Sequence, residues 1–295
     1  MRLLVIGHSV EDHFTEKGSS VVKPGGIYYT GLALQKFKSL EDEVYLNTSV
    51  ADENYKLFAY LYDTIPHDYF SKVDKIPKVY LTLHDFKERG ETYESISQSL
   101  EVKTENLKQF DGILINMITG FDIGIEQLRE IRKNYKGKIF LDVHTLSRGL
   151  DEDLKRNFRP VPGFEEWASA VDIIQVNENE IKTIGSGENE FDMAEDILSK
   201  GVKFLIVTKG ENGARLYYME DGELFSIFKP SVLVKATNKI GCGDVFGAVF
   251  FYNYIKTGDA RVSLEIANIA AGCSATYDNF ENYDLLRQDV FSRYY

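Results

Sequence analysis

The sequence is poor in cysteine, and it has no long hydrophobic run. Its two cysteines, Cys242 and Cys273, are too few for a disulfide framework, and no cysteine–histidine cluster has the spacing of a metal site. No stretch approaches the roughly 18 apolar residues that a membrane span requires. The run Leu3–Ile6 is too short for the apolar core of a signal peptide. We therefore expect a cytoplasmic protein with no membrane partner.

A basic stripe is also missing. The formal net charge is −12, and acidic and basic residues are interleaved along the chain. Nucleic-acid binding would require a positively charged face, so we expect no nucleic-acid partner. With 295 residues, of which 43% are hydrophobic, the chain can bury a large core. We expect a single domain over residues 1–295.

Short β-branched runs alternate with helical segments along most of the chain. Several of these runs are apolar at nearly every position, which is typical of strands covered on both faces. Strands alternating with helices predict an α/β fold with a doubly wound, mostly parallel sheet. We expect strands at 3–7, 43–49, 112–116, 138–143, 171–177 and 203–209, and helices at 28–40, 53–63, 124–134, 178–184 and 191–200.

Three regions depart from this alternation. Asp221-Gly222 lies between two strand-like runs and predicts a hairpin within residues 213–228. Two long helices are expected after it, at 243–257 and about 261–277. The segments at about 8–26 and 78–97 read as short strands and turns. They are either surface loops or a small β-strand lid over a cleft.

The stretch ATNKIGCGDVFGAVFF, residues 236–251, places a glycine-spaced turn directly before a run that is apolar around the whole helix. A buried helix start leaves backbone N–H groups that need partners from outside the helix. Gly241 and Gly243 have no side chain, so another group can approach the backbone closely. Such a site attracts anions, because the N–H donors and the helix dipole both favour negative charge.

Asp244 lies in the first turn of this helix, where its carboxylate can accept a proton or a hydrogen bond. An anion site beside a carboxylate suits phosphoryl transfer to an alcohol: the donors hold the charge of the phosphoryl group and the carboxylate takes the proton of the hydroxyl. The alternative is structural, with Asp244 as a helix cap and the glycines as a turn.

Residues 238–251 resemble the C-terminal signature of the PfkB/ribokinase family of carbohydrate kinases, whose usual form is D-T-T-G-A-G-D before an apolar helix. Here the stretch reads NKIGCGD, so Asn238, Lys239 and Ile240 replace the first three family residues. The resemblance implies a ribokinase-like, three-layer fold and an ATP-dependent kinase. It assigns the anion site to Gly241, Cys242 and Gly243 and the general base to Asp244.

The N-terminal part is similar to the family in the regions that bind the substrate. LLVIGHSVEDHF is similar to the first strand and the aspartate after it, here Asp12, whose carboxylate would accept hydrogen bonds from substrate hydroxyls. KPGGIYYTGLAL is similar to the family's glycine pair, here Gly25 and Gly26. Thr30 stands where the family often has an asparagine.

DIIQVNENEI is similar to the family's N-x-x-E motif, which implies that Asn177 and Glu180 organise a hydrated Mg²⁺. The local alternative is an ordinary helix start. IVTKGENGARLY is similar to the nucleotide-binding strand and turn and implies nucleotide contacts from Thr208, Gly210 and Gly213; Asn268 would approach the adenine. In LDVHTLSRG, Asp142 and Arg148 match an aspartate and an arginine of many members, although both could be structural.

These residues together predict ATP-dependent phosphorylation of a hydroxyl on a small sugar or sugar-like substrate, that is, a phosphotransferase with an alcohol group as acceptor. ATP and Mg²⁺ are the implied cofactors; a monovalent cation and a homodimer formed through the lid are left open. A nucleoside or polyol kinase is the alternative within the family, and a non-catalytic sensor with the same fold is the alternative outside enzymes. A Rossmann oxidoreductase is excluded because GHSVED lacks the G-x-G-x-x-G spacing, and a serine hydrolase because no G-x-S-x-G is present.

Overall fold

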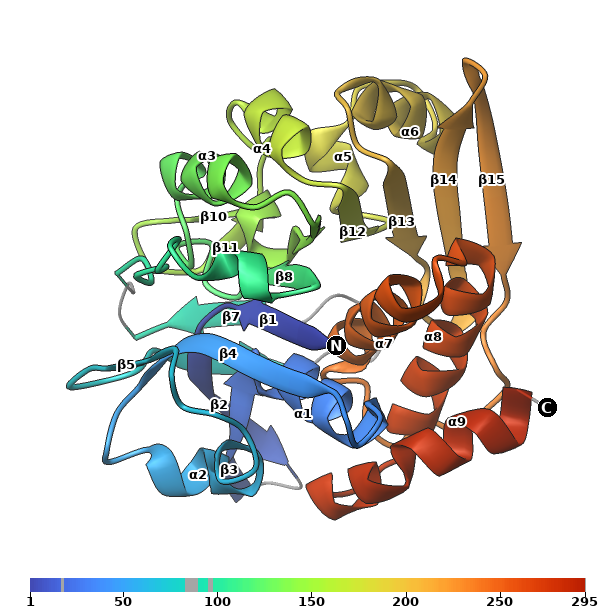
Figure 1. The fold of residues 1–295 in the computed structure, drawn as a ribbon. Helices are drawn as coiled ribbons and strands as arrows, with labels where there is room; N and C mark the ends of the chain where they lie inside the picture. The colour runs from blue at the N-terminus through green and yellow to red at the C-terminus, as the bar shows by residue number, and fades with distance from the viewer. Residues whose placement is uncertain (17–18, 83–89, 95–97, 295) are drawn as a thin grey trace.

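The computed structural model describes residues 1–16, 19–82, 90–94 and 98–294, and its centre is a nine-stranded sheet (Figure 1). The strand order is β15-β14-β13-β12-β9-β8-β1-β4-β5. Neighbours from β13 to β5 are parallel, whereas β13, β14 and β15 are antiparallel. The strands are β1 (Arg2–Ile6), β4 (Glu43–Val50), β5 (Phe70–Lys72), β8 (Gly112–Asn116), β9 (Lys138–Asp142), β12 (Ile173–Asn177), β13 (Phe204–Thr208), β14 (Ala214–Glu220) and β15 (Glu223–Lys229). The predicted doubly wound, mostly parallel sheet is confirmed.

Helices cover both faces of this sheet, and each face has its own hydrophobic cluster. One cluster includes residues of α1 (Tyr28–Phe37), α2 (Tyr55–Tyr62), α7 (Cys242–Thr257), α8 (Ala260–Ser274) and α9 (Leu286–Tyr294). The other includes residues of α3 (Ile125–Asn134), α4 (Phe164–Ala170), α5 (Ile181–Ile184) and α6 (Glu190–Ser199). The result is a three-layer α/β architecture.

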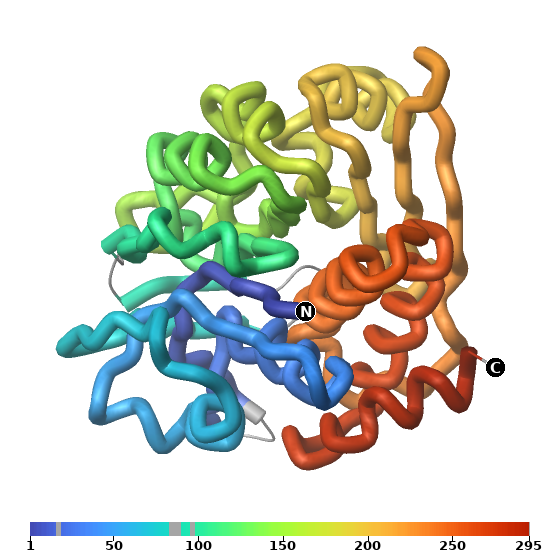
Figure 2. Tube along the Cα trace, viewed as in Figure 1, coloured from blue at the N-terminus to red at the C-terminus, as the bar shows by residue number. Residues whose placement is uncertain are grey.

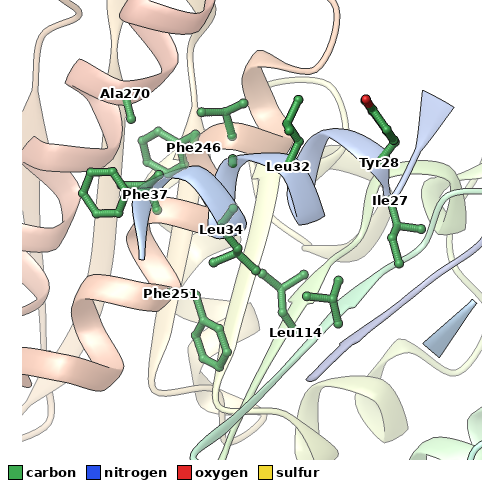
Figure 3. Packing of buried hydrophobic residues seen from close by; sticks show 14 of the residues in the cluster. Ile27, Tyr28, Leu32, Leu34, Phe37, Leu114, Phe246, Phe251 and Ala270 are labelled. Carbon is green, nitrogen blue, oxygen red and sulfur yellow. The ribbon is translucent and has the colours of Figure 1, made fainter. Parts of the chain in front are cut away.

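α7 is the most deeply placed helix of its layer. Its residues from Val245 to Tyr254 are all buried, as its apolar circumference predicted. Figure 3 shows Phe246 and Phe251 of this helix among Leu34 and Phe37 of α1 and Leu114 of β8. Figure 2 shows how the last part of the chain returns to pack beside the N-terminal helix α1. The part of α7 that follows its first turn is therefore anchored in the core.

The two segments that departed from the βα alternation form one small sheet in their described parts. Its order is β3-β2-β6-β7, with β2 (Ser9–Glu16), β3 (Ser19–Gly26), β6 (Lys78–Thr82) and β7 (Gly90–Tyr93). Residues 83–89 and 95–97 of the predicted 78–97 segment lie outside the described residues. Burial alternates along β6, where Val79 and Leu81 are buried and Tyr80 is exposed, whereas Ser9, Val10, Glu11 and Asp12 of β2 are all buried.

Several boundaries differ from the predictions. The helix expected at 28–40 ends at Phe37 because Lys38 is extended, and the helix expected at 178–184 begins only at Ile181. The predicted hairpin is confirmed: Asp221 and Gly222 have φ angles of 52° and 82°, as a two-residue turn of this kind requires. Short elements were not predicted: α4, α9, β5, β10 (Arg148–Leu150), β11 (Arg156–Phe158), η1 (Leu107–Gln109), η2 (His144–Ser147), η3 (Gly210–Asn212) and η4 (Phe280–Leu285). Among the described residues, no helix has the length and apolarity to span a membrane.

Candidate active site

The carboxyl ends of four parallel strands bring polar side chains to one edge of the sheet. Asn116 at the end of β8 is paired in register with Asp142 at the end of β9. Asp142 is also paired with Gln175 of β12, and Asn177, the last residue of β12, with Thr208. In open α/β sheets ligands bind outside this edge, and the start of α7 lies at the same edge, as its hydrogen bonds show.

The turn before α7 is built on Gly241. This residue has a φ of 79°, and a Cβ atom there would stand 2.3 Å from Cδ1 of Tyr29. Gly243, by contrast, is exposed, and a Cβ there would meet nothing within 4 Å. The space in front of the first turn of α7 is therefore open to a ligand, as an anion site requires. Burial raises the pKa of the Cys242 thiol, so the contribution expected from Cys242 is its backbone rather than its sulfur.

A small cavity of about 30 Å³ lies between this turn and the four-stranded sheet. It is lined by four of the predicted site residues, namely Asp12, Gly26, Gly241 and Asp244, together with Glu91 and His144. The lining also includes the apolar residues Val79, Leu81 and Ile118. The structure thus brings the predicted substrate aspartate and the predicted base to one cavity.

Asp12 and the glycine pair depend on each other sterically. A Cβ at Gly25 would stand 2.3 Å from the carboxyl carbon of Asp12, so only glycine leaves room for this side chain. Gly26 has a φ of 64°, and a Cβ there would come within 2.2 Å of the backbone oxygen of His8. Thr30 is placed differently from the other predicted substrate residues. It is 0% exposed, does not line the cavity, and donates its hydroxyl to Asn116 Oδ1 at 2.8 Å.

A buried group of charged side chains lies behind the cavity. Burial raises the pKa of the Asp142 carboxyl well above its ordinary value, and the nearby Asp244 and Glu180 carboxylates act in the same direction. Arg148 Nη1 lies 3.4 Å from Glu91 Oε1, and its Nη2 lies 3.5 Å from Glu180 Oε1. Asp142 and Arg148 therefore both belong to this buried group of charged side chains.

His144 was not singled out by the sequence analysis. Its φ of 30° is unusual for a residue with a side chain, and such backbone conformations are concentrated at functional sites. Its Nδ1 lies 3.6 Å from Glu180 Oε1. Burial alone would lower the pKa of His144, but the Glu180 and Glu91 carboxylates together outweigh it and raise the pKa above its ordinary value. Glu91 and Asn116 were missed as well, because neither belongs to a short motif.

Asn177 and Glu180 hold each other and the turn into α5. Asn177 Oδ1 accepts hydrogen bonds from the N–H of Asn179 (2.8 Å) and of Glu180 (2.9 Å), and Glu180 Oε2 accepts one from the N–H of Asn177 (2.9 Å). The second Glu180 oxygen faces Arg148 and His144, and Glu180 is 3% exposed. This geometry favours the local alternative, a reciprocal cap. No group of three or more histidine, cysteine, aspartate or glutamate side chains that could hold a metal ion occurs in the described part of the chain. A contact of this pair to a hydrated Mg²⁺ stays a prediction.

The predicted nucleotide residues lie away from the cavity. Thr208 Oγ1 donates to the backbone oxygen of Val176 at 3.3 Å, and Gly210 has a φ of 53° in an open turn. Gly213 permits close approach of Lys229, whose oxygen would stand 2.1 Å from a Cβ, and Asn268 Nδ2 donates to the same oxygen at 3.1 Å. These contacts give Gly213 and Asn268 a structural role at the end of β15. Lys239 is exposed to solvent.

Part of the sequence matches a model of a known protein family. Residues 143–282 match the family model described as pfkB family carbohydrate kinase. Among curated proteins, the deoxyribokinase of Salmonella typhi is 28% identical over 142 residues, which cover 45% of this chain and 45% of the relative. The matched part thus spans less than half the length of that relative.

Solved structures extend the likeness to the whole chain. The Arabidopsis thaliana ribokinase, in complex with ribose and ATP, aligns with a TM-score of 0.74 over 98% of both chains at 16% identity. The Burkholderia thailandensis nucleoside kinase, in complex with inosine, aligns with a TM-score of 0.75 over 100% of this chain and 97% of its own at 15% identity. At such identities the likeness shows the fold. The predicted ribokinase-like architecture and the resemblance to the PfkB/ribokinase family are both confirmed.

Proposed function

We propose that this chain, which carries the pfkB family match on a ribokinase-like fold, is an ATP-dependent kinase that phosphorylates a hydroxyl of a small sugar. One observation carries the proposal: Asp244, in the first turn of α7 beside the Gly241 turn, lines the same cavity as Asp12. A base, an anion site and a diol-binding carboxylate are the three groups that phosphoryl transfer to a sugar requires.

In the proposed reaction the sugar lies in the cavity with its hydroxyls donating to the carboxylate of Asp12. The acceptor oxygen attacks the γ-phosphorus of ATP, the bond to the bridging oxygen breaks, and ADP leaves. Asp244 takes the proton that the acceptor hydroxyl loses. Backbone N–H groups of Gly241, Cys242, Gly243 and Asp244 hold the charge on the transferred phosphoryl group.

The small sheet β3-β2-β6-β7 is proposed as a lid, as part of a single domain over 1–295. The cavity of about 30 Å³ lies between the small sheet and the Gly241 turn, so a movement of the small sheet away from this turn would widen it for a sugar. Closure over the substrate would exclude the water that competes for the γ-phosphoryl group. Pairing of two lids in a homodimer stays a prediction.

ATP as the donor is supported by the fold likeness to a ribokinase whose structure contains ribose and ATP. Contacts to ATP from Thr208, Gly210, Gly213 and Asn268 stay predictions, as does a monovalent cation. Mg²⁺ is expected to accompany ATP, and we assign it no step at Asn177 and Glu180, whose oxygens serve the backbone and neighbouring charges. A cytoplasmic location is likewise a prediction.

A nucleoside kinase is the second candidate. The rings of Tyr29 and Tyr93 line the cavity, and stacking on aromatic rings is a common way to hold a base. The similarity to a nucleoside kinase with bound inosine is consistent with this candidate. A polyol kinase stays the other alternative within the family. A sensor would not need Asp244 in the cavity.

The test is an ADP-release assay with Mg-ATP over a panel of sugars, polyols and nucleosides, with the Asp244→Asn variant in parallel. Turnover on one class of compound, lost in the variant, would support the kinase and identify the acceptor. A panel without turnover, in which sugars or ATP still raise the melting temperature, would favour the sensor instead.

A further inference from the structure

A chain of hydrogen bonds runs from α1 to α7 through Asn116 at the carboxyl end of β8. Thr30 Oγ1 donates to Asn116 Oδ1 at 2.8 Å, and Asn116 Nδ2 donates to Asp244 Oδ1 at 3.4 Å. Thr30 is 0% exposed and Asn116 is 1% exposed. Neither residue lines the cavity, and Asp244 links this chain of hydrogen bonds to the cavity wall.

The Thr30 hydroxyl determines which way the Asn116 amide points. An asparagine side chain has one acceptor end and one donor end. Because the hydroxyl donates to the oxygen, the two amide hydrogens face the carboxyl groups on the other side. One goes to Asp244 Oδ1 and the other to Asp142 Oδ2 at 3.1 Å. Both hydrogens of the Asn116 amide are therefore donated to carboxyl groups, one of them at the start of α7.

A second buried amide holds the same helix start. Gln175 Nε2 donates to the backbone oxygen of Gly243 at 3.1 Å and lies 3.4 Å from Asp142 Oδ2. Asn116 and Gln175 come from β8 and β12, the strands on either side of β9, which ends at Asp142. One amide holds the backbone of the first turn and the other holds the Asp244 side chain. Of these two amides, Asn116 is the one that contacts the side chain of the proposed base.

We propose that Asn116 is a positioning residue for the Asp244 carboxylate and that Thr30 sets the orientation of its amide. The inference rests on the proposed function of Asp244. A carboxylate in the first turn of a helix has several rotamers, and only some of them point at the acceptor hydroxyl. A donor fixed in the sheet selects one, and misplacing a reacting group by about 1 Å can reduce the rate about a hundredfold.

Asn116→Leu tests this directly, because leucine has a similar size and no donor. We expect kcat per folded enzyme to fall about 10- to 100-fold, while the KM values for ATP and for the acceptor change less than about twofold. Thr30→Val removes the hydroxyl that orients the amide, and we expect a smaller fall in kcat of about 3- to 10-fold. Thr30→Ser keeps the hydroxyl and should restore kcat to within about twofold. If Asn116→Leu does not fold, the two Thr30 variants decide the question.

Asn47→Leu is the matched control. Asn47 is also a buried asparagine of a parallel strand, and its amide donates to the backbone oxygens of Tyr69 and Glu101 instead of to a carboxyl group. It should lose stability without losing kcat. Unchanged kcat in Asn116→Leu or Thr30→Val, with only a lower melting temperature, would overturn the inference and leave the kinase standing. A wild-type chain without turnover on the whole panel would overturn the proposed function, and this inference with it.

Discussion

The ring of Tyr29 lies against the backbone of Gly241, so a Cβ at residue 241 would stand 2.3 Å from the ring. Gly258 ends the same helix with nearly the same backbone, φ 73° against 79°, but a Cβ there would meet nothing within 4 Å. The two ends of α7 therefore have the same backbone conformation, but only the glycine at the start of the helix is in contact with another side chain.

This difference predicts unequal effects of the same substitution. Gly258→Ala should lose roughly 1–2 kcal/mol of unfolding free energy, because alanine is strained at positive φ. Gly241→Ala should lose the same amount plus about 1–3 kcal/mol for the overlap with Tyr29. Urea denaturation of both variants measures the difference. Equal losses would show that the ring moves aside without cost.

Asp244→Asn should reduce kcat by about 10²- to 10⁴-fold, because asparagine cannot accept the proton of the acceptor hydroxyl. The melting temperature should stay close to that of the wild type. Asp259→Asn, at the start of α8, is the control: Asp259 caps the N–H groups of Arg261 and Val262, and asparagine caps equally well. Near-normal turnover in Asp244→Asn would remove Asp244 from the role of base.

Gly25→Ala should act on the substrate rather than on the fold. The added methyl group would displace the Asp12 carboxylate, which stands 2.3 Å from its position. We expect the KM for the acceptor to rise about tenfold, because the diol contact is lost, while the KM for ATP stays constant. Steady-state kinetics on the acceptor identified by the panel would show it. Gly90→Ala, in the same small sheet with a nearest contact of 3.5 Å, should change neither constant.

Asp142→Asn should make stability less dependent on pH. The pKa of Asp142 is raised in the folded protein. The protonated carboxyl group therefore stabilises the folded protein fully at a pH below the ordinary pKa of a carboxyl group. This stabilisation is lost as the pH rises through the pKa that Asp142 has in the folded protein. Asparagine cannot ionise, so the stability of the variant relative to the wild type should increase from pH 4 to pH 7. Denaturation at several pH values measures this trend. The exposed Asp278→Asn variant should show no such increase, and a flat difference for Asp142 would contradict its raised pKa.

Asn177→Asp should leave the Mg²⁺ dependence of turnover unchanged to within about twofold. Aspartate accepts the same backbone hydrogen bonds as asparagine, so the cap survives. Asn177→Ala should lose about 1 kcal/mol of stability, with the same Mg²⁺ dependence. A titration of turnover with Mg²⁺ tests both variants. A clear change in Mg²⁺ affinity in Asn177→Asp would assign this side chain to the metal instead of the cap.

The strands of the large sheet and the buried helix α7 could be predicted from the local pattern of apolar residues alone. Residues 113–115 of β8 are apolar because both faces of the strand are covered, and Val245–Tyr254 is buried on all sides. Burial on every side leaves a signal in consecutive residues. The Gly241 turn is equally evident from the sequence, since its positive φ of 79° favours glycine. For these elements the physical cause lies within one short stretch of sequence, and the sequence by itself determined them.

The partners of the site residues were decided by the tertiary structure. Thr30 lies where a substrate contact was expected but donates to Asn116, 86 residues away in the chain. His144 reaches the cavity through an unusual backbone conformation, and Glu180 is buried against Arg148. Each of these contacts depends on which strands are neighbours and on where each strand ends. Strand order is a property of the whole sheet, so no local pattern specifies it.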